Sequence, residues 1–142
     1  MRTLHVGGST NAAAILESLA LVIPFSAYLM RVRMSLAINV TNLSAAASAR
    51  VGMEVSQAGT FSLGVTQGTF GLLDRGGTSL CGMQTVLQTS VGSLTLGPWG
   101  MVQEFSTMST KLVKNNVLYC HVYNSGFAAG QTYSDFWLDF EP

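Results

Sequence analysis

Apolar and polar residues alternate along residues 28–44, which read YLMRVRMSLAINVTNLS. Apolar side chains occupy the even positions from Met30 to Val40, and polar or small side chains occupy the odd positions from Arg31 to Thr41. Successive side chains of a β-strand point to opposite faces of its sheet, so this period of two predicts a strand with one buried face. We expect the even residues in a core and the odd residues at the surface.

Shorter alternating runs follow along the chain, and turns rich in glycine and asparagine separate them. Val51, Met53 and Val55 share one face of the first of these runs. Short strands at a spacing of roughly 8–12 residues are typical of two packed antiparallel sheets. The pattern therefore predicts an all-β fold, a single β-sandwich or jelly-roll-like domain of about eight strands. Further predicted strands are residues 61–66, 101–105, 117–123 and 132–140, and predicted turns are residues 74–77 and 124–126.

The N-terminal part allows two interpretations. Residues 1–9 look like a short arm that ends at a Gly-Gly break, and the polar residues after it are suitable N-caps for a helix over residues 12–18. Apolar residues at odd positions from Leu19 onward equally fit an edge strand, in which Pro24 requires an edge or a bulge. The expected division is residues 1–27 as arm with helix or edge strand, and residues 28–142 as the sandwich domain.

The apolar stretch over residues 12–30 approaches the length of a membrane span, which needs about 20 residues. Glu17 and Pro24 interrupt it, and a single arginine precedes it, so we expect neither a membrane segment nor a signal peptide. Without a secretory route, we interpret the two N-x-S/T triplets at Asn39 and Asn42 as coincidental.

The composition is unusual in its low charge. Hydrophobic residues make up 48% of the chain and charged residues only 10%, with a net charge of zero, whereas ordinary soluble domains are about 25% charged. A sparsely charged surface is poorly protected against association, which favours a subunit that buries its faces against copies of itself. The alternative is a soluble domain with a neutral polar coat. No basic arm is present, so we expect no direct nucleic-acid binding.

Candidate chemistry is scarce. The sequence holds no nucleophile elbow, phosphate loop or dinucleotide-binding motif. Cys120 and His121 are neighbours, but adjacent strand residues point to opposite faces and cannot share a metal ion. Asp135, Asp139 and Glu141 read as the solvated edge of the last strand. We therefore expect no catalytic, cofactor-binding or metal-binding residues and no enzyme.

The two cysteines, Cys81 and Cys120, form no C-x-x-C pair. They could form one disulfide bridge or remain two buried thiols, and we favour buried thiols. No disulfide framework indicates a secreted protein.

Two C-terminal strands carry bulky residues on both faces. In residues 117–123 the even positions are apolar, while the odd positions carry Tyr119, His121 and Tyr123, and Trp137 stands on the odd face of the last strand. A strand of an open sandwich normally has one polar side, so these odd faces need a second partner. That partner is the N-terminal segment of the chain, another subunit, or a sugar stacked on an exposed platform.

The candidate contact residues follow from this pattern. For subunit contacts we favour the tyrosines and the tryptophan together with the apolar stretch over residues 19–25. Two arginines on the polar face of the first long strand could hold a carboxylate or phosphate, or could pair with Asp135 and Asp139. The interface or ligand-stacking candidates are Tyr119, His121, Tyr123, Trp137, Leu19, Leu21, Ile23 and Phe25, and the anion-contact candidates are Arg31 and Arg33.

The chain ends in the hydrophobic strand DFWLDFEP, after a series of strands punctuated by glycine, with few charges and many serines and threonines. This pattern resembles small viral structural proteins of the single jelly-roll or β-sandwich kind, which include coat subunits and the decoration proteins of phage heads. The resemblance implies a location in the virion, self-association into a trimer or a larger shell, and contacts with other virion proteins. It implies no membrane partner.

Overall fold

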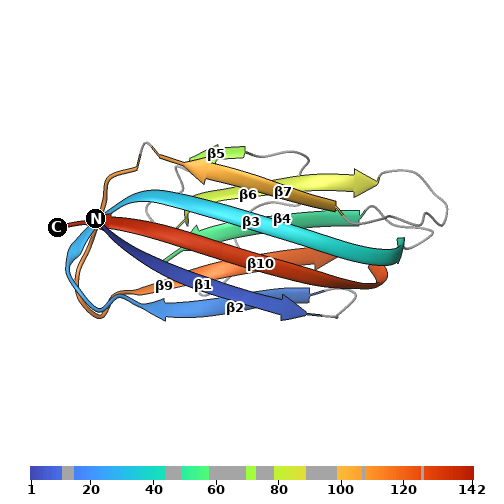
Figure 1. The fold of residues 1–142 in the computed structure, drawn as a ribbon, viewed down its shortest axis with the longest axis horizontal. Coiled ribbons are helices and arrows are strands. Elements are labelled where there is room, and N and C mark those ends of the chain that lie inside the picture. Colours follow the sequence, from blue (N-terminus) through green and yellow to red (C-terminus); the bar gives the residue numbers. More distant parts are fainter. Residues whose placement is uncertain are drawn as a thin grey trace.

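Ten β-strands make up the described part of the chain in this computed structural model, and they form two antiparallel five-stranded sheets (Figure 1). Residues 1–10, 15–43, 49–57, 70–72, 79–88, 99–106, 108–125 and 127–142 are described. Within these ranges there is no helix, and so none that is long and apolar enough to span a membrane. The predicted all-β sandwich is confirmed.

The two sheets are called sheet A and sheet B below. Sheet A runs in the order β1, β10, β3, β7, and β8 also pairs with β3; sheet B runs in the order β2, β9, β4, β6, β5. The strands of sheet A are β1 (Arg2–Thr10), β10 (Phe127–Glu141), β3 (Ala27–Leu43), β7 (Trp99–Phe105) and β8 (Thr110–Leu112). The strands of sheet B are β2 (Ile15–Val22), β9 (Val117–Ser125), β4 (Ala49–Ser56), β6 (Ser79–Gln88) and β5 (Phe70–Leu72).

The strand pairing is nested along the chain. β1 pairs with β10, β2 with β9, β3 with β7, and β4 with β6. Two further pairs, β10 with β3 and β9 with β4, join the halves of each sheet. The chain is thus one long antiparallel ribbon rolled up on itself, which is a jelly-roll-like arrangement of two sheets.

The core lies between the sheets and follows the predicted alternation. On β3, Val32, Met34 and Leu36 are at most 1% exposed, whereas Arg31 and Arg33 are exposed. The even residues of β9 from Leu118 to Val122, and those of β10 from Thr132 to Phe140, are buried in the same way, because each strand turns one face inward. The core residues contributed by these two strands are Leu118, Cys120, Val122, Phe136, Leu138 and Phe140.

The N-terminal arm is the main error of the sequence interpretation. Residues 2–10 form β1, which pairs with β10 along its whole length, from Arg2 opposite Phe140 to Thr10 opposite Thr132. The Gly-Gly pair does not break the strand, because Gly7 and Gly8 keep their places in the register. Leu4 and Val6 of β1 pack partly buried against the core, so the expected arm is a strand of the sheet.

The helix expected over residues 12–18 is also wrong where it can be checked. Residues 15–22 form β2, at the edge of sheet B, so the alternative of an edge strand is correct. Pro24 lies beyond the end of β2, where its missing N–H costs no ladder hydrogen bond. Residues 12–14 lie outside the described residues, as do the predicted strand over residues 61–66 and the predicted turn over residues 74–77.

Both cysteines are free and buried in the core. They lie on either side of Val55, because Cys81 on β6 and Cys120 on β9 are both its register partners. Two strand spacings separate them, about 9.6 Å, which is beyond the Cα separation of about 7 Å that a disulfide tolerates. Burial raises the pKa of Cys120 to about 12 and also raises the pKa of Cys81, so both stay protonated thiols.

Candidate functional site

The outer face of sheet A carries an ordered row of charged residues near one end. Thr3, Asp139 and Arg31 are register partners on three adjacent strands. The Thr3 hydroxyl donates to Oδ1 of Asp139 at 2.5 Å, and Arg31 Nε donates to Oδ2 at 2.6 Å. The Asp139 side chain is only 8% exposed, so its carboxylate is largely shielded from water, whereas the Arg31 side chain is partly exposed.

The surroundings of Asp139 determine its protonation. Its burial alone would raise its pKa, because burial disfavours the charged form. Hydrogen bonds from Thr3 and Arg31 and the positive charges of Arg31 and Arg33 outweigh that effect, so the net pKa of Asp139 is lowered. Arg31 therefore pairs with Asp139 of its own chain, which was one of the two alternatives that the sequence allowed. Its guanidinium is not left free to bind an external anion.

The next row on this face is centred on Trp137. His5 and Arg33 are its register partners on the two neighbouring strands. The His5 ring centroid lies 5.2 Å from that of Trp137, and the Arg33 guanidinium carbon lies 4.7 Å above the indole, within the range of a cation–π contact. Trp137 is half-buried between these two partners.

A glycine makes room for the carboxylate beside this row. Nε2 of His5 lies 2.7 Å from Oδ1 of Asp135, and both side chains are partly exposed. A Cβ atom at Gly7, the register partner of Asp135, would lie only 2.7 Å from that same Oδ1. The absence of a side chain at Gly7 therefore allows Asp135 to lie across β1 and reach His5.

Beside the row of Asp135, small and apolar residues are exposed on this face. Tyr133, Ala37 and Gly100 are register partners in one row, and Val102 lies next to them on β7. Tyr133 is 44% exposed and Val102 is 66% exposed, with the small residues between them also exposed. We call these four residues the apolar end of sheet A.

The outer face of sheet B carries a different set of polar residues. Ser18 on β2 and Glu54 on β4 are the register partners of His121 on β9. The Ser18 hydroxyl lies 2.6 Å from Nδ1 of His121, and the Tyr119 ring is parallel to the His121 ring at 6.0 Å. Ser18 is exposed, whereas Glu54 and His121 are fully buried. We call Ser18, His121 and Glu54 the serine–histidine row.

The structure separates the aromatic residues that the sequence analysis grouped. Trp137 lies on the outer face of sheet A, and Tyr119 and His121 lie on the outer face of sheet B, so they form no common surface. The backbone of Tyr123 pairs with Leu16 and Gly52, and its side chain lies outside the described residues.

The apolar stretch proposed for subunit contacts belongs to the core of its own chain. Ile23 is fully buried, and Leu19, Leu21 and Phe25 pack partly buried against the core. The expectation of subunit contacts through Ile23 is therefore wrong, because the inward face of β2 and the turn after it cover the end of the sandwich.

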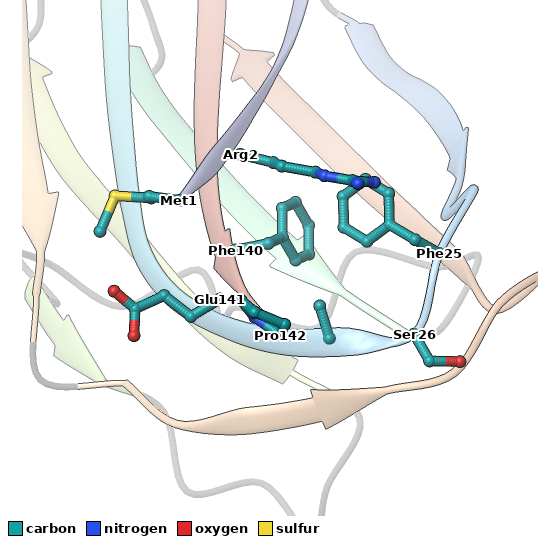
Figure 2. A pocket seen from close by; sticks show the side chains of 8 residues that line it. Met1, Arg2, Phe25, Ser26, Phe140, Glu141 and Pro142 are labelled. Atoms are coloured by element: carbon teal, nitrogen blue, oxygen red, sulfur yellow. The ribbon is translucent and has the colours of Figure 1, made fainter.

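A small cavity of about 260 Å³ opens at the end of the sandwich where the two chain termini lie (Figures 1 and 2). The Phe25 and Phe140 rings meet edge to face at 5.3 Å on its wall, and the Arg2 guanidinium carbon lies 4.8 Å over the Phe25 ring. Figure 2 shows Glu141 on the opposite side of the opening. The cavity is mostly apolar and lies apart from both rows.

Sequence reasoning missed the serine–histidine row because its members come from three separate strands. Ser18 and Glu54 carry no local motif, and only the register brings them beside His121. Within the described residues, no group of three histidine, cysteine or acidic side chains could hold a metal ion. A comparison of the sequence with protein-family models finds no match, and a comparison with curated proteins finds none either.

Proposed function

We propose that this chain is a structural subunit of a virus particle, either a coat protein or a capsid decoration protein. It acts in the virion by associating with copies of itself, as a trimer or a larger shell, and with other virion proteins. This role requires no catalysis. The nested strand order supports the proposal, because jelly rolls recur among viral capsid domains.

A fold alone does not define a function, so the proposal depends on one surface observation. The apolar end of sheet A exposes Val102 and Tyr133 with only small, uncharged side chains between them. Interface centres are depleted in charge and enriched in tyrosine. A second copy of the chain is the occupant that explains both this surface and the charge content of 10%.

The first experiment measures the mass of the purified protein by light scattering, followed by electron microscopy of the same sample. We expect closed oligomers or shells. Val102→Asp places a charge in the apolar end and should abolish them, because burying an unpaired charge is costly. Val113→Asp is the matched control, since Val113 is also exposed, at 48%, but lies in the turn after β8.

The outcomes of this experiment are distinct. A wild-type monomer, or assembly that survives Val102→Asp unchanged, would contradict the proposal. Loss of assembly in both variants would show a general effect of added charge, and would remove the assignment to the apolar end of sheet A.

A sugar-binding head domain of a fibre or adhesin is the second candidate, and Trp137 is the residue that favours it. Half-exposed tryptophans with polar neighbours are suited to stacking on sugars, and His5 and Asp135 supply hydrogen-bonding groups beside it. However, Arg33 already occupies one side of the indole. Binding to a glycan array that disappears in Trp137→Ala would favour this function over assembly.

A further inference from the structure

In the serine–histidine row, an exposed serine hydroxyl lies 2.6 Å from a buried histidine nitrogen. We propose that Ser18 accepts an acyl group from an activated ester, with His121 as its general base and Glu54 as the residue that positions the histidine. Covalent catalysis by serine needs a base within hydrogen-bond reach and a third group that orients the base. The row supplies all three residue types on adjacent strands, and this inference is independent of the proposed structural role.

Solvent reaches the proposed nucleophile but not its base. Ser18 is exposed and lies on β2, the edge strand of sheet B, so an ester can reach its hydroxyl from solvent. His121 is fully buried and its Nδ1 lies 2.6 Å from the Ser18 hydroxyl. Burial of His121 and Glu54 removes competing water from the base, which strengthens the interactions between these groups.

The reaction step is an acyl transfer to oxygen. The Ser18 hydroxyl proton moves to Nδ1 of His121 while Oγ forms a bond to the ester carbonyl carbon. The bond from that carbon to the leaving oxygen then breaks, and the leaving group departs with the electron pair and the proton held on Nδ1. The products are O-acyl-Ser18 and a free alcohol.

The edge position also supplies groups that could stabilise the oxyanion. An edge strand directs alternate backbone N–H groups away from its sheet partner, so, among the strands that the structure describes, β2 has N–H donors without a second strand partner within one residue of Ser18. Donors aimed at the developing oxyanion are usually a large part of acyl-transfer catalysis.

The neighbours of Ser18 define the class of acyl group. Ala20 follows Ser18 on the same face of β2, and its register partner on β9 is Tyr119. The Tyr119 ring is half-buried and parallel to His121, and it forms a flat wall beside the hydroxyl. We expect short, unbranched acyl groups such as acetyl, which fit in the space that the small Ala20 side chain leaves beside the Tyr119 ring.

The test uses the folded full-length chain and a fluorophosphonate probe, in which Ser18 Oγ displaces fluoride from phosphorus. Peptide mapping by mass spectrometry should place a single label on Ser18, and urea-unfolded protein should remain unlabelled. His121→Gln should slow labelling by about 100-fold, the usual contribution of a general base. Acetylation by p-nitrophenyl acetate should follow the same pattern.

Three variants separate positioning from general structure. Glu54→Gln should slow labelling while the circular dichroism spectrum stays unchanged, because the base remains but the residue that positions it is altered. Glu54→Asp, which keeps the carboxylate, should restore part of the labelling rate. His5→Ala is the matched control, since His5 also pairs with a carboxylate but lies on sheet A; it should label like the wild type.

Labelling of other serines, or equal labelling of folded and unfolded protein, would overturn the proposal. Because His121 is buried, its variant is checked by circular dichroism. The wild-type mapping decides the question even if that variant does not fold. Light scattering of the same samples reports assembly separately, so failure of labelling and failure of the proposed function are distinguishable.

Discussion

At the scale of single residues, the register between neighbouring strands decides which side chains each charged residue contacts. Asp139 illustrates the rule, because its two oxygens bind Thr3 on one side and Arg31 on the other. Asp135 differs from it, since it is 40% exposed and contacts His5 at the surface. A buried carboxylate with hydrogen-bond donors, such as Asp139, contributes to stability, whereas an exposed charge pair, such as that of Asp135, contributes little.

We predict that Asp139→Asn lowers the free energy of unfolding by about 1–3 kcal/mol at pH 7, because hydrogen bonds to a charged group are lost. The lowered pKa makes the contribution of Asp139 complete above its unfolded pKa of about 3.9. That contribution is lost as the pH falls from there toward the folded pKa. Urea unfolding should therefore show a smaller difference between variant and wild type at pH 3 than at pH 7.

The matched control for this prediction is Asp135→Asn. Its carboxylate is exposed, so the free energy of unfolding should change by less than about 0.5 kcal/mol. A difference between Asp139→Asn and wild type that is the same at both pH values would contradict the assignment of the lowered pKa.

At the scale of elements, two connections that cross between the sheets support each other. The turn over residues 113–116 leads from β8 in sheet A to β9 in sheet B, and the segment around Ile23 leads from β2 to β3 in the opposite direction. The Asn115 N–H donates to the Ile23 carbonyl at 2.8 Å, and the Ile23 N–H donates to the Asn116 carbonyl at 2.9 Å. This backbone pairing holds one end of the sandwich closed.

Asn115 has a positive φ of 73° within this turn. We predict that Asn115→Val destabilises the protein by about 1–2 kcal/mol, because a β-branched residue is strained in the left-handed region. Asn115→Gly should be neutral or slightly stabilising there. Urea unfolding measures both, with Lys114→Ala as the neighbouring control. Equal stability of the valine and glycine variants would show that the positive φ is not required.

At the scale of the whole molecule, the first strand is held by the last. Thr3 and Asp139 are 136 residues apart in sequence, yet they share a hydrogen bond. A fold whose pairs join such distant strands must close long loops before those contacts stabilise it, so we expect slow folding, on the millisecond to second scale. It also makes the N-terminal residues part of the sandwich rather than an appendage.

We predict that deletion of residues 1–9 strongly destabilises the protein, because it removes β1 and leaves β10 as an open edge. The melting temperature should fall by more than about 8 °C, as expected for a loss above about 2 kcal/mol in a domain of this size. Thermal unfolding followed by circular dichroism measures this change. A melting temperature equal to that of the full chain would instead agree with a free arm.

The amino-acid sequence alone determined which face of the two longest strands, β3 and β10, is buried. The alternation from Arg31 to Leu36 and from Asp135 to Phe140 is visible in the sequence and corresponds to the core, because burial of apolar side chains selects one face of a strand. The low charge and the turn asparagines are equally local properties. All of these depend on residues within a few positions of one another.

Only the tertiary structure decided which strands are neighbours. Periodicity carries no information about pairing partners, so the sequence could not show that β1 pairs with β10, or that Trp137 and Tyr119 lie on opposite faces of the sandwich. The meeting of Ser18, His121 and Glu54 has the same origin. Hydrogen bonding between distant strands fixes the register, and that register brings together side chains that no local pattern connects.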